Sequence, residues 1–221
     1  MRTGRGNGTP GGLTVAAPRI GVLVSGSGTT LQNLLDRRRA GTLAAEIAVV
    51  VSSEPGVRAL DRARDAGLAV ATVPWRGSGG AGPFGISVTA VLEEAGADLA
   101  LLAGFLRLYR FPDRWRWRVM NIHPALLPAF GGRGMYGAQV HEAVIRSGAK
   151  VSGCTVHFAD HAYDRGPIIL QRTCPVRLED SPDELARRVF ALEQEAYPEA
   201  VRLYAEGRLE VADGRVRVRE G

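Results

Sequence analysis

Lysine, cysteine and long apolar runs are scarce in this sequence of 221 residues. Lys150 is the one lysine, and no Gly-Lys-Ser or Gly-Lys-Thr occurs, which excludes a Walker-type nucleotide-binding loop. Schiff-base chemistry therefore has a single candidate residue. Because a membrane-spanning helix needs roughly 20 apolar residues, and residues 99–106 form the longest nearly unbroken apolar run, we expect no membrane association.

Two cysteines, Cys154 and Cys174, are too few for a disulfide framework. Residues 1–18 are rich in Gly, Thr and Arg and lack the continuous apolar stretch of a secretory signal. A cytoplasmic location is therefore expected. A chain of this length usually forms one core, so we predict a disordered extension over residues 1–18 and a single domain over residues 19–221.

The net charge of +5 suits either nucleic acid or an anionic small substrate. Basic residues are scattered, however, and no recognised nucleic-acid-binding motif occurs. Residues 110–118, which contain Trp115 and Trp117, give a nucleic-acid-binding module its only support. That segment is more typical of an amphipathic surface, so we expect small-molecule partners and no nucleic acid.

Short apolar segments alternate with helix-like segments along most of the chain. Strands are predicted at residues 19–24, 47–51, 69–73, 99–103 and 119–122. Their unbroken Val, Ile, Leu and Ala character is typical of parallel strands that are covered on both faces. Leu31, Leu34 and Leu35 have helical spacing, and further helices are predicted over residues 57–66 and 86–95, with a glycine-rich loop at 74–85.

The pattern changes after residue 150, where residues 151–158 and 168–176 predict two longer strands. Ser181 and Glu184 form a capping box that opens a helix ending near residue 204. Residues 209–218 predict a hairpin. The sequence therefore predicts an α/β fold with an open, mostly parallel, Rossmann-like sheet and antiparallel strands toward the C-terminus.

A glycine-rich loop at residues 25–30 joins the first strand to the first helix. Its backbone N–H groups and the helix dipole would suit a phosphate. Leu31 occupies the place of the third glycine of a dinucleotide-binding fingerprint, which argues against such a cofactor. The alternative is an ordinary turn in which Thr29 or Thr30 caps the helix.

All four histidines lie between residues 123 and 161. No Cys or Glu stands at ligand spacing from them, so we expect no metal site. His141, His157 and His161 are each interpreted as satisfied core or surface residues. His123 differs, because it follows a predicted parallel strand, and ligands of open α/β sheets bind at the carboxyl ends of such strands.

Asn121 and His123 are two residues apart, so an extended backbone directs both side chains to the same side. An amide donor and an imidazole at one point can hold a developing oxyanion and move a proton. Asp164, in an Asp-Arg-Gly-Pro turn, is the acid most suited to lie beside them. Taken alone, Asp164 would more often be a turn-capping residue. A neighbouring carboxylate should favour the protonated form of His123.

Four segments together resemble a known family: residues 24–32, 102–107, 121–128 and 163–171. Their Ser-Gly-Ser-Gly, Asn-Ile-His-Pro and Asp-Arg-Gly-Pro motifs occur in the order and spacing of the phosphoribosylglycinamide formyltransferases. The resemblance covers about residues 19–212 and extends to the Glu-Gln-Glu-Ala-Tyr-Pro segment that begins at Glu193. It implies the formyltransferase fold and formyl transfer from 10-formyltetrahydrofolate to a glycinamide ribonucleotide in purine biosynthesis, without a metal.

The resemblance also assigns roles to individual residues. Asn121, His123 and Asp164 correspond to the catalytic residues. The ribonucleotide would bind Gly28, Thr29, Thr30 and Glu193. The folate cosubstrate would bind Leu106, Arg107, Leu108, Tyr109, Asn121, Asp160, His161, Ala162, Tyr163 and Asp164.

The sequence departs from the family pattern at two places. Thr30 stands where the family usually has Asn, and the glycine-rich residues 74–85 contain no clear match to a basic residue often used near the folate. Residues 131–137 resemble one branch of the family, and we expect Arg133 to reach an anionic substrate. The expected assembly is a monomer or a homodimer.

Three alternatives remain beside this interpretation. Methionyl-tRNA formyltransferase shares the catalytic residues, but it carries a further C-terminal RNA-binding domain, and few residues follow Tyr204 here. A basic nucleic-acid-binding module would show steeply salt-dependent binding. An inactive phosphate-binding relative is disfavoured, because Asn121, His123 and Asp164 are all present.

Overall fold

The structure is a computed structural model that describes residues 17–220. Its elements are β1 (Arg19–Val24), α1 (Thr29–Arg39), β2 (Glu46–Ser52), α2 (Arg58–Asp65), β3 (Val70–Thr72), α3 (Ala81–Glu94), β4 (Leu99–Leu102), a 3₁₀ turn (Asp113–Trp115), β5 (Val119–His123), α4 (Ala138–Ser147), β6 (Val151–Phe158), β7 (Ile168–Pro175), α5 (Pro182–Ala205), β8 (Leu209–Ala212) and β9 (Arg215–Val218). The predicted extension at residues 1–18 lies outside the described residues except for Ala17 and Pro18. Pro18 is buried.

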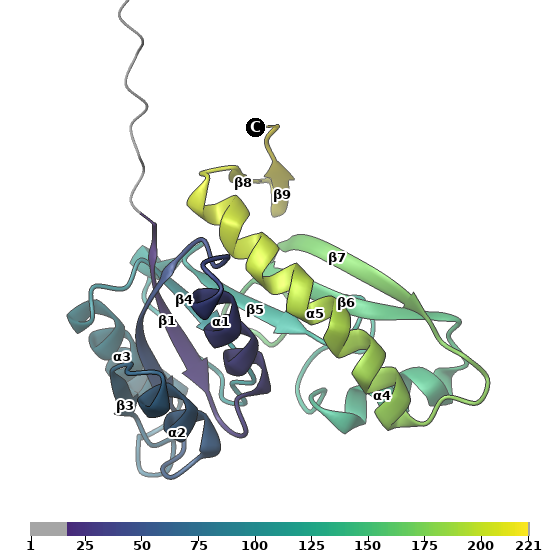
Figure 1. The fold of residues 1–221 in the computed structure, drawn as a ribbon, viewed down its shortest axis with the longest axis horizontal. Helices are drawn as coiled ribbons and strands as arrows, with labels where there is room; N and C mark the ends of the chain where they lie inside the picture. The colour runs from purple at the N-terminus through teal and green to yellow at the C-terminus, as the bar shows by residue number, and fades with distance from the viewer. Residues whose placement is uncertain (1–16, 221) are drawn as a thin grey trace, which may run out of the picture.

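One seven-stranded sheet runs through the molecule in the order β3-β2-β1-β4-β5-β6-β7 (Figure 1). The pairs β1–β2, β1–β4, β2–β3 and β4–β5 are parallel, whereas β5–β6 and β6–β7 are antiparallel. The predicted fold class is confirmed. The strand order reverses at β1, with β2 and β3 on one side and β4 and β5 on the other. Open α/β sheets bind ligands in the crevice at the carboxyl ends of the strands beside such a point.

Helices cover the sheet on both faces. One core cluster joins apolar residues of α1, α2, α4 and α5 to the sheet, with Leu31, Val144 and Tyr197 among its buried members. The other cluster packs Phe84 and Leu92 of α3 against the opposite face. Because helices bury both faces of the sheet, the sequences of β1, β2 and β4 are almost continuously apolar.

The helices differ from the sequence prediction in two places. α3 begins at Ala81, so the predicted loop at residues 74–85 ends earlier than expected. The first turn of α3 is helical despite Gly82, Pro83 and Gly85, because Phe84 is fully buried and Gly85 lies against the backbone of Arg110. α4 was not predicted, and it follows the glycine-rich residues 131–137.

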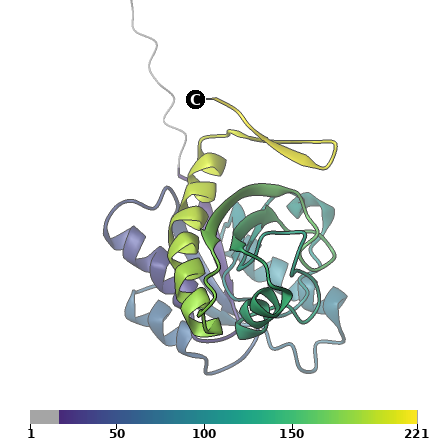
Figure 2. The ribbon, with the colours of Figure 1, turned by 90° about the vertical axis from the view of Figure 1, so that its right-hand side faces the viewer.

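α5 begins at the predicted capping box. The Ser181 side chain accepts a hydrogen bond from the Glu184 N–H, Glu184 caps the Ser181 N–H in return, and Pro182 is the first helical residue. In Figure 2, the predicted β8–β9 hairpin extends beyond the C-terminal end of α5.

Over residues 17–220, no helix combines the length and the apolar character needed to cross a membrane.

Candidate active site

A cavity of about 980 Å³ opens at the carboxyl ends of β4 and β5. Its lining includes the predicted site residues Thr29, Thr30, Leu106, Arg107, Leu108, Tyr109, Asn121, His123, Asp160, Ala162, Tyr163, Asp164 and Glu193. Gly28 and His161 do not line it. The exposed His161 ring instead packs against Phe111, with 5.0 Å between the ring centroids. The β-strand ends therefore gather most of the predicted residues around one space.

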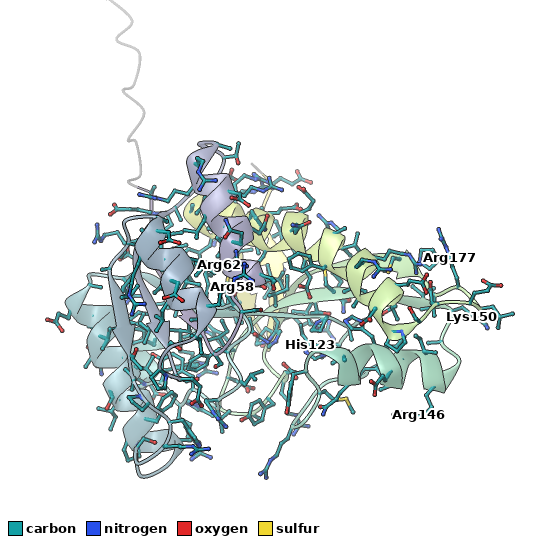
Figure 3. All side chains as sticks on the ribbon, turned by 60° about the horizontal axis from the view of Figure 1, so that its bottom comes forward. Arg58, Arg62, His123, Arg146, Lys150 and Arg177 are labelled. Atoms are coloured by element: carbon teal, nitrogen blue, oxygen red, sulfur yellow. The ribbon has the colours of Figure 1, made fainter. Side chains whose placement is uncertain are left out.

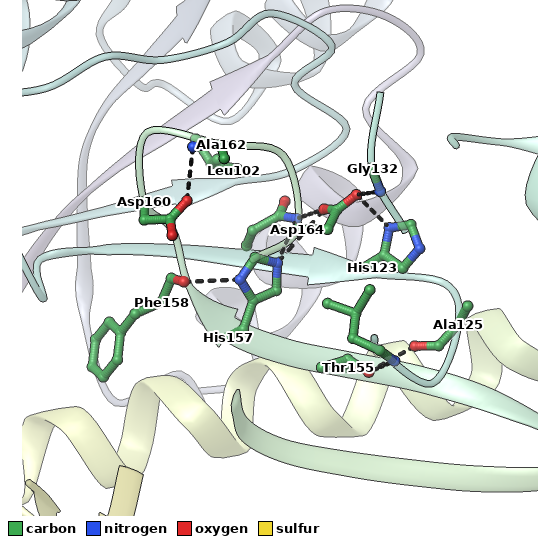
Figure 4. A network of polar contacts seen from close by, with 12 residues as sticks. Leu102, His123, Ala125, Gly132, Thr155, His157, Phe158, Asp160, Ala162 and Asp164 are labelled. Carbon is green, nitrogen blue, oxygen red and sulfur yellow. Dashed lines mark hydrogen bonds and ion pairs between the residues drawn. The ribbon is translucent and has the colours of Figure 1, made fainter. Parts of the chain in front are cut away.

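Asn121, His123 and Asp164 all line this cavity and lie close together. Figure 4 shows His123 beside Asp164. The Asn121 Nδ2 donates to Asp164 Oδ1 at 3.2 Å. The His123 Nδ1 lies 3.6 Å from Asp164 Oδ2. Both side chains leave β5 on the same side, as their spacing predicts, and the 163–167 turn brings the carboxylate to them.

The second nitrogen of His123 identifies its tautomer. Nε2 lies 2.8 Å from the Phe130 carbonyl oxygen, and a carbonyl only accepts, so Nε2 carries the hydrogen. In the neutral ring, Nδ1 is then the basic atom, and it faces Asp164. Figure 3 shows His123 in the middle of the molecule, between the part with α2 and the part with α4.

The Asp164 carboxylate favours the protonated form of His123, as expected, but the burial of the ring outweighs it. Burial lowers the pKa of His123, which is 3% exposed, and this effect exceeds the opposing effect of the Asp164 carboxylate, so the pKa lies below its ordinary value. His123 is consequently neutral at pH 7 before any reaction begins. Sequence reasoning included the carboxylate but not the loss of water around the ring.

Asp164 is held by several donors. Its Oδ2 accepts a hydrogen bond from the Gly132 N–H at 2.9 Å, and its Oδ1 accepts from Asn121. Burial alone would raise the pKa of Asp164, but its contacts with His157, His123 and Gly132 lower it below the ordinary value. Its backbone has a φ of 57°, a left-handed conformation that Asp adopts more readily than most residues. The carboxylate is therefore ionised and fixed in place.

Sequence reasoning missed His157 as a member of this group. In the antiparallel β5–β6 pair, His157 stands directly opposite Asn121. Its Nε2 lies 3.0 Å from the Asn121 Nδ2 and 3.7 Å from Asp164 Oδ1. The ring is buried and hydrogen-bonded, as the interpretation of a satisfied core histidine expects. The contact of His157 with Asn121 follows only from the register between β5 and β6, two strands that are far apart in the sequence.

The glycine-rich loop carries no side-chain cap. Gly28, with a φ of 73°, is the residue before α1, so the alternative in which Thr29 or Thr30 caps the helix is wrong. Thr29 and Thr30 are the first two residues of the helix and line the cavity. Their side chains therefore face the ligand space, where the N-terminus of α1 favours an anion.

Arg62, labelled on α2 in Figure 3, supports the loop from outside. Its Nε donates to the Ser27 carbonyl oxygen at 2.9 Å, and its Nη1 donates to the Gln32 side chain. On the inner side, the Ser25 hydroxyl accepts a hydrogen bond from the Leu106 N–H at 3.0 Å. The loop is thus connected to α2 on one side and to the segment after β4 on the other.

The segment after β4 supplies apolar and cationic groups to the cavity. Leu106 and Leu108 line it beside Trp75. Arg107 pairs with Glu54 at 2.7 Å, and its guanidinium lies 5.6 Å from the centre of the Trp75 ring. Arg107 Nε is buried and has no hydrogen-bond partner within residues 17–220. This wall therefore combines apolar surface with one arginine whose Nε is buried and unpaired within residues 17–220.

α5 contributes Glu193 to the cavity. Burial raises the pKa of Glu193 to about 8, so the carboxyl is largely protonated at neutral pH. Arg133 also lines the cavity, from the glycine-rich segment before α4. His141 of α4 is 5% exposed, and its Nδ1 lacks a partner in the described part of the chain.

No cluster of three metal-ligating side chains occurs among residues 17–220.

Residues 18–201 match the sequence profile described as formyl transferase. The chain is 42% identical to glycinamide ribonucleotide transformylase 1 from Symbiobacterium toebii, with a TM-score of 0.84 and coverage of 93% of this chain and 95% of that one.

Two curated relatives show the same likeness. The chain is 38% identical to the trifunctional purine biosynthetic protein adenosine-3 of Gallus gallus, over 88% of this chain but only 19% of that protein. It is 37% identical to the chloroplastic phosphoribosylglycinamide formyltransferase of Vigna unguiculata, over 89% of this chain and 64% of the relative. The chain thus spans about a fifth of the first and about two thirds of the second.

Proposed function

The chain belongs to the formyl transferase family, and we propose that it is a phosphoribosylglycinamide formyltransferase of de novo purine biosynthesis. The reaction forms a bond between the glycinamide amine and the formyl carbon, breaks the bond from that carbon to N10 of the folate, and moves one proton from the amine to N10. 10-Formyltetrahydrofolate supplies the formyl carbon and the leaving nitrogen. No step requires a metal or a nicotinamide.

One observation carries this proposal. Asn121, His123 and Asp164 converge within a cavity that also reaches the N-terminus of α1 and Glu193. A phosphate-binding helix end and a proton-transfer group therefore share one space. A substrate that carries both a phosphate and a reactive amine fits such an arrangement.

His123 acts as the proton carrier. Its neutral Nδ1 accepts the proton that the amine loses on attack, and the resulting imidazolium lies beside the Asp164 carboxylate. That charge also stabilises the negative oxygen that develops on the transferring formyl group. His123 or a bound water then returns the proton to the leaving nitrogen. His123 is therefore weakly basic before the reaction, and its imidazolium is stabilised by Asp164 once the proton has been transferred.

Asn121 supplies an N–H donor to the developing oxyanion. Its Nδ2 faces Asp164, the side on which His123 also lies, and one N–H can be shared between two acceptors. Loss of a single oxyanion donor typically lowers the rate by about 10² to 10³. The Asp164 carboxylate orients both neighbours and does not itself need to change its protonation.

The ribonucleotide is assigned to the α1 side of the cavity. The backbone N–H groups and hydroxyls of Thr29 and Thr30 bind the phosphate, with Gly28 providing the left-handed turn that precedes them. Glu193, protonated at neutral pH, can both donate and accept hydrogen bonds with the sugar and glycinamide groups. Arg133 lies on the same cavity and suits an anionic substrate group.

The folate is assigned to the wall after β4 and to the 160–164 loop. Apolar Leu106 and Leu108 suit a flat ring, and the Arg107 side chain, which also lines the cavity, suits an acceptor on it. Tyr109, Asp160, Ala162 and Tyr163 complete this wall. His161 lies outside the cavity, so its assignment to the folate has no support from the geometry.

Formyl transfer itself tests the proposal. The purified chain is incubated with 10-formyltetrahydrofolate and glycinamide ribonucleotide, and both products are quantified by absorbance and mass spectrometry. Omitting the ribonucleotide measures simple hydrolysis of the donor, and charged methionyl-tRNA tests the rival acceptor. Transfer that requires the ribonucleotide supports the proposal. A folded sample that forms no formylated ribonucleotide contradicts it.

A cytoplasmic location and small-molecule partners remain part of the proposal. Cys154 and Cys174 are free and buried, and burial raises the pKa of the Cys154 thiol to about 12. Such thiols are unreactive and consistent with a reducing compartment.

A further inference from the structure

His157 is buried in β6, beside Asn121 and at the border of the cavity. The β5–β6 register places the two residues directly opposite one another, and His157 is 1% exposed. A buried imidazole needs partners for both nitrogens, because an unpaired polar atom away from water is costly. The identity of those partners determines what the ring can do.

The first partner fixes the tautomer of His157. Its Nδ1 lies 2.8 Å from the Phe158 carbonyl oxygen (Figure 4). Because a carbonyl oxygen only accepts, Nδ1 carries the hydrogen, and in the neutral ring Nε2 is an acceptor. This acceptor faces the Asn121 Nδ2 at 3.0 Å.

The second partner fixes the orientation of the Asn121 amide. One Nδ2 hydrogen points to His157 Nε2 and the other to Asp164 Oδ1, at 3.2 Å. A flipped amide would place its oxygen against two acceptors and lose both hydrogen bonds. Without His157, only the contact with Asp164 would oppose this flip or a rotation of the amide.

We propose that His157 is a positioning residue that holds the Asn121 amide with its nitrogen toward Asp164 and His123. The transferring oxygen then meets an N–H donor and not the lone pairs of the amide oxygen. This inference rests on the proposed function, because it assigns Asn121 to that reaction. His157 also lies 3.7 Å from Asp164 Oδ1, but its side-chain hydrogen bond is with Asn121, and the proposed effect on the reaction is exerted through that amide.

Three substitutions of His157 distinguish the roles of its two ring nitrogens. Gln places an acceptor near Nε2, Asn places a donor near Nδ1, and Phe keeps the ring volume without either. We expect His157→Phe and His157→Asn to lower kcat by roughly 10- to 100-fold, with KM for both substrates changed less than about threefold. His157→Gln should retain most of kcat. Comparing Gln with Asn decides the question even if the Phe variant does not fold.

A double-mutant cycle tests whether His157 acts through Asn121. In an Asn121→Ala background, His157→Asn should lower kcat by less than about twofold, because the amide that it positions is gone. Equal losses in the Gln and Asn variants would overturn the proposal and leave a packing role. Multiplicative losses in the double variant would overturn it as well.

Nitrogen NMR tests, independently of activity, whether His157 orients the Asn121 amide. We expect the His157 ring to carry its hydrogen on Nδ1, and the Asn121 side-chain NH₂ signal to shift and broaden in His157→Asn but not in His157→Gln. A hydrogen on Nε2 would contradict the proposal. If the wild type transfers no formyl group, the proposed function fails, while this measurement still decides whether His157 orients Asn121.

Discussion

Gly28 faces Ala59 of α2 so closely that a β-carbon on residue 28 would lie 2.7 Å from the Ala59 Cβ and 2.9 Å from its Cα. The same glycine has a φ of 73°, which side-chain-bearing residues adopt at a cost. Gly28 is therefore required by the packing of α1 against α2 as well as by the turn. In the proposed phosphate site, Gly28 places the N–H groups that follow it.

Gly28→Ala should consequently destabilise the fold. The strained φ and the contact with Ala59 together should lower the free energy of unfolding by about 2 to 4 kcal/mol. Gly26→Ala is the matched control, because the space at Gly26 is open and its φ is not positive, and it should cost less than about 0.5 kcal/mol. Urea unfolding followed by circular dichroism measures both. Equal stability of the two variants would contradict the packing argument.

Arg62→Met should weaken ribonucleotide binding without a comparable loss of kcat. The substitution removes the donor to the Ser27 carbonyl and the contact with Gln32, so the phosphate loop is less well ordered. We expect the KM for the ribonucleotide to rise by roughly 10-fold and the KM for the folate to change little. Arg64→Met is the control, because within residues 17–220 the Arg64 side chain pairs only with Asp61 of the same helix. Steady-state kinetics with each substrate varied in turn checks the difference.

The sequence predicted the sheet well because the strands and the α5 cap are encoded locally. Unbroken apolar segments reveal β1, β2 and β4, and Ser181 with Glu184 reveals the start of α5. α4 escaped prediction, because the glycines that precede it give no capping signal. α3 begins earlier than predicted, because the tertiary burial of Phe84 exceeds the low helix propensity around it.

The candidate site was predictable to the extent that its residues share one strand or one turn. Asn121 and His123 could be placed together from their spacing alone. His157 could not, because its contact with Asn121 depends on the register between β5 and β6. The protonation state of His123 depends on its burial by the surrounding residues. That burial arises from tertiary packing and cannot be predicted from the neighbouring sequence.

Glu193→Gln should stabilise the protein at alkaline pH. Because burial raises the pKa of Glu193 from 4.5 to about 8, the folded state keeps a proton in this window that the unfolded state has lost. Unfolding therefore releases a proton, and the contribution of Glu193 to stability falls as the pH rises from about 4.5 to 8. Gln resembles the protonated carboxyl and removes this dependence.

The stability difference between Glu193→Gln and the wild type should thus grow between pH 5 and 8 and then level off. Thermal unfolding at a series of pH values measures it. Glu195→Gln, which alters an exposed carboxyl on the same helix, should show no such growth. A difference for Glu193→Gln that is constant across this range would mean that the carboxyl is ionised in the folded protein.

His123→Ala and Asp164→Asn should lower kcat far more than they change substrate binding, because their interactions strengthen as charge develops in the transition state. His123→Ala removes both a proton carrier and an oxyanion partner, so kcat should fall by at least about 10² to 10³. Combined with Asp164→Asn, the loss should be less than multiplicative, because the carboxylate acts mainly on the His123 ring. Strictly multiplicative losses would show that the two side chains act separately.

The pH dependence of kcat/KM adds a second test of this pair. Because the pKa of His123 lies below 6.5 and the neutral ring accepts the proton, activity should fall as the pH drops below that value. Asp164 raises the pKa of His123, so Asp164→Asn should move this acid limb to still lower pH while lowering the plateau. Asp160→Asn is the control, because Asp160 lines the cavity without contacting His123, and its limb should stay in place. An acid limb that moves to higher pH in Asp164→Asn would mean that another group carries the proton.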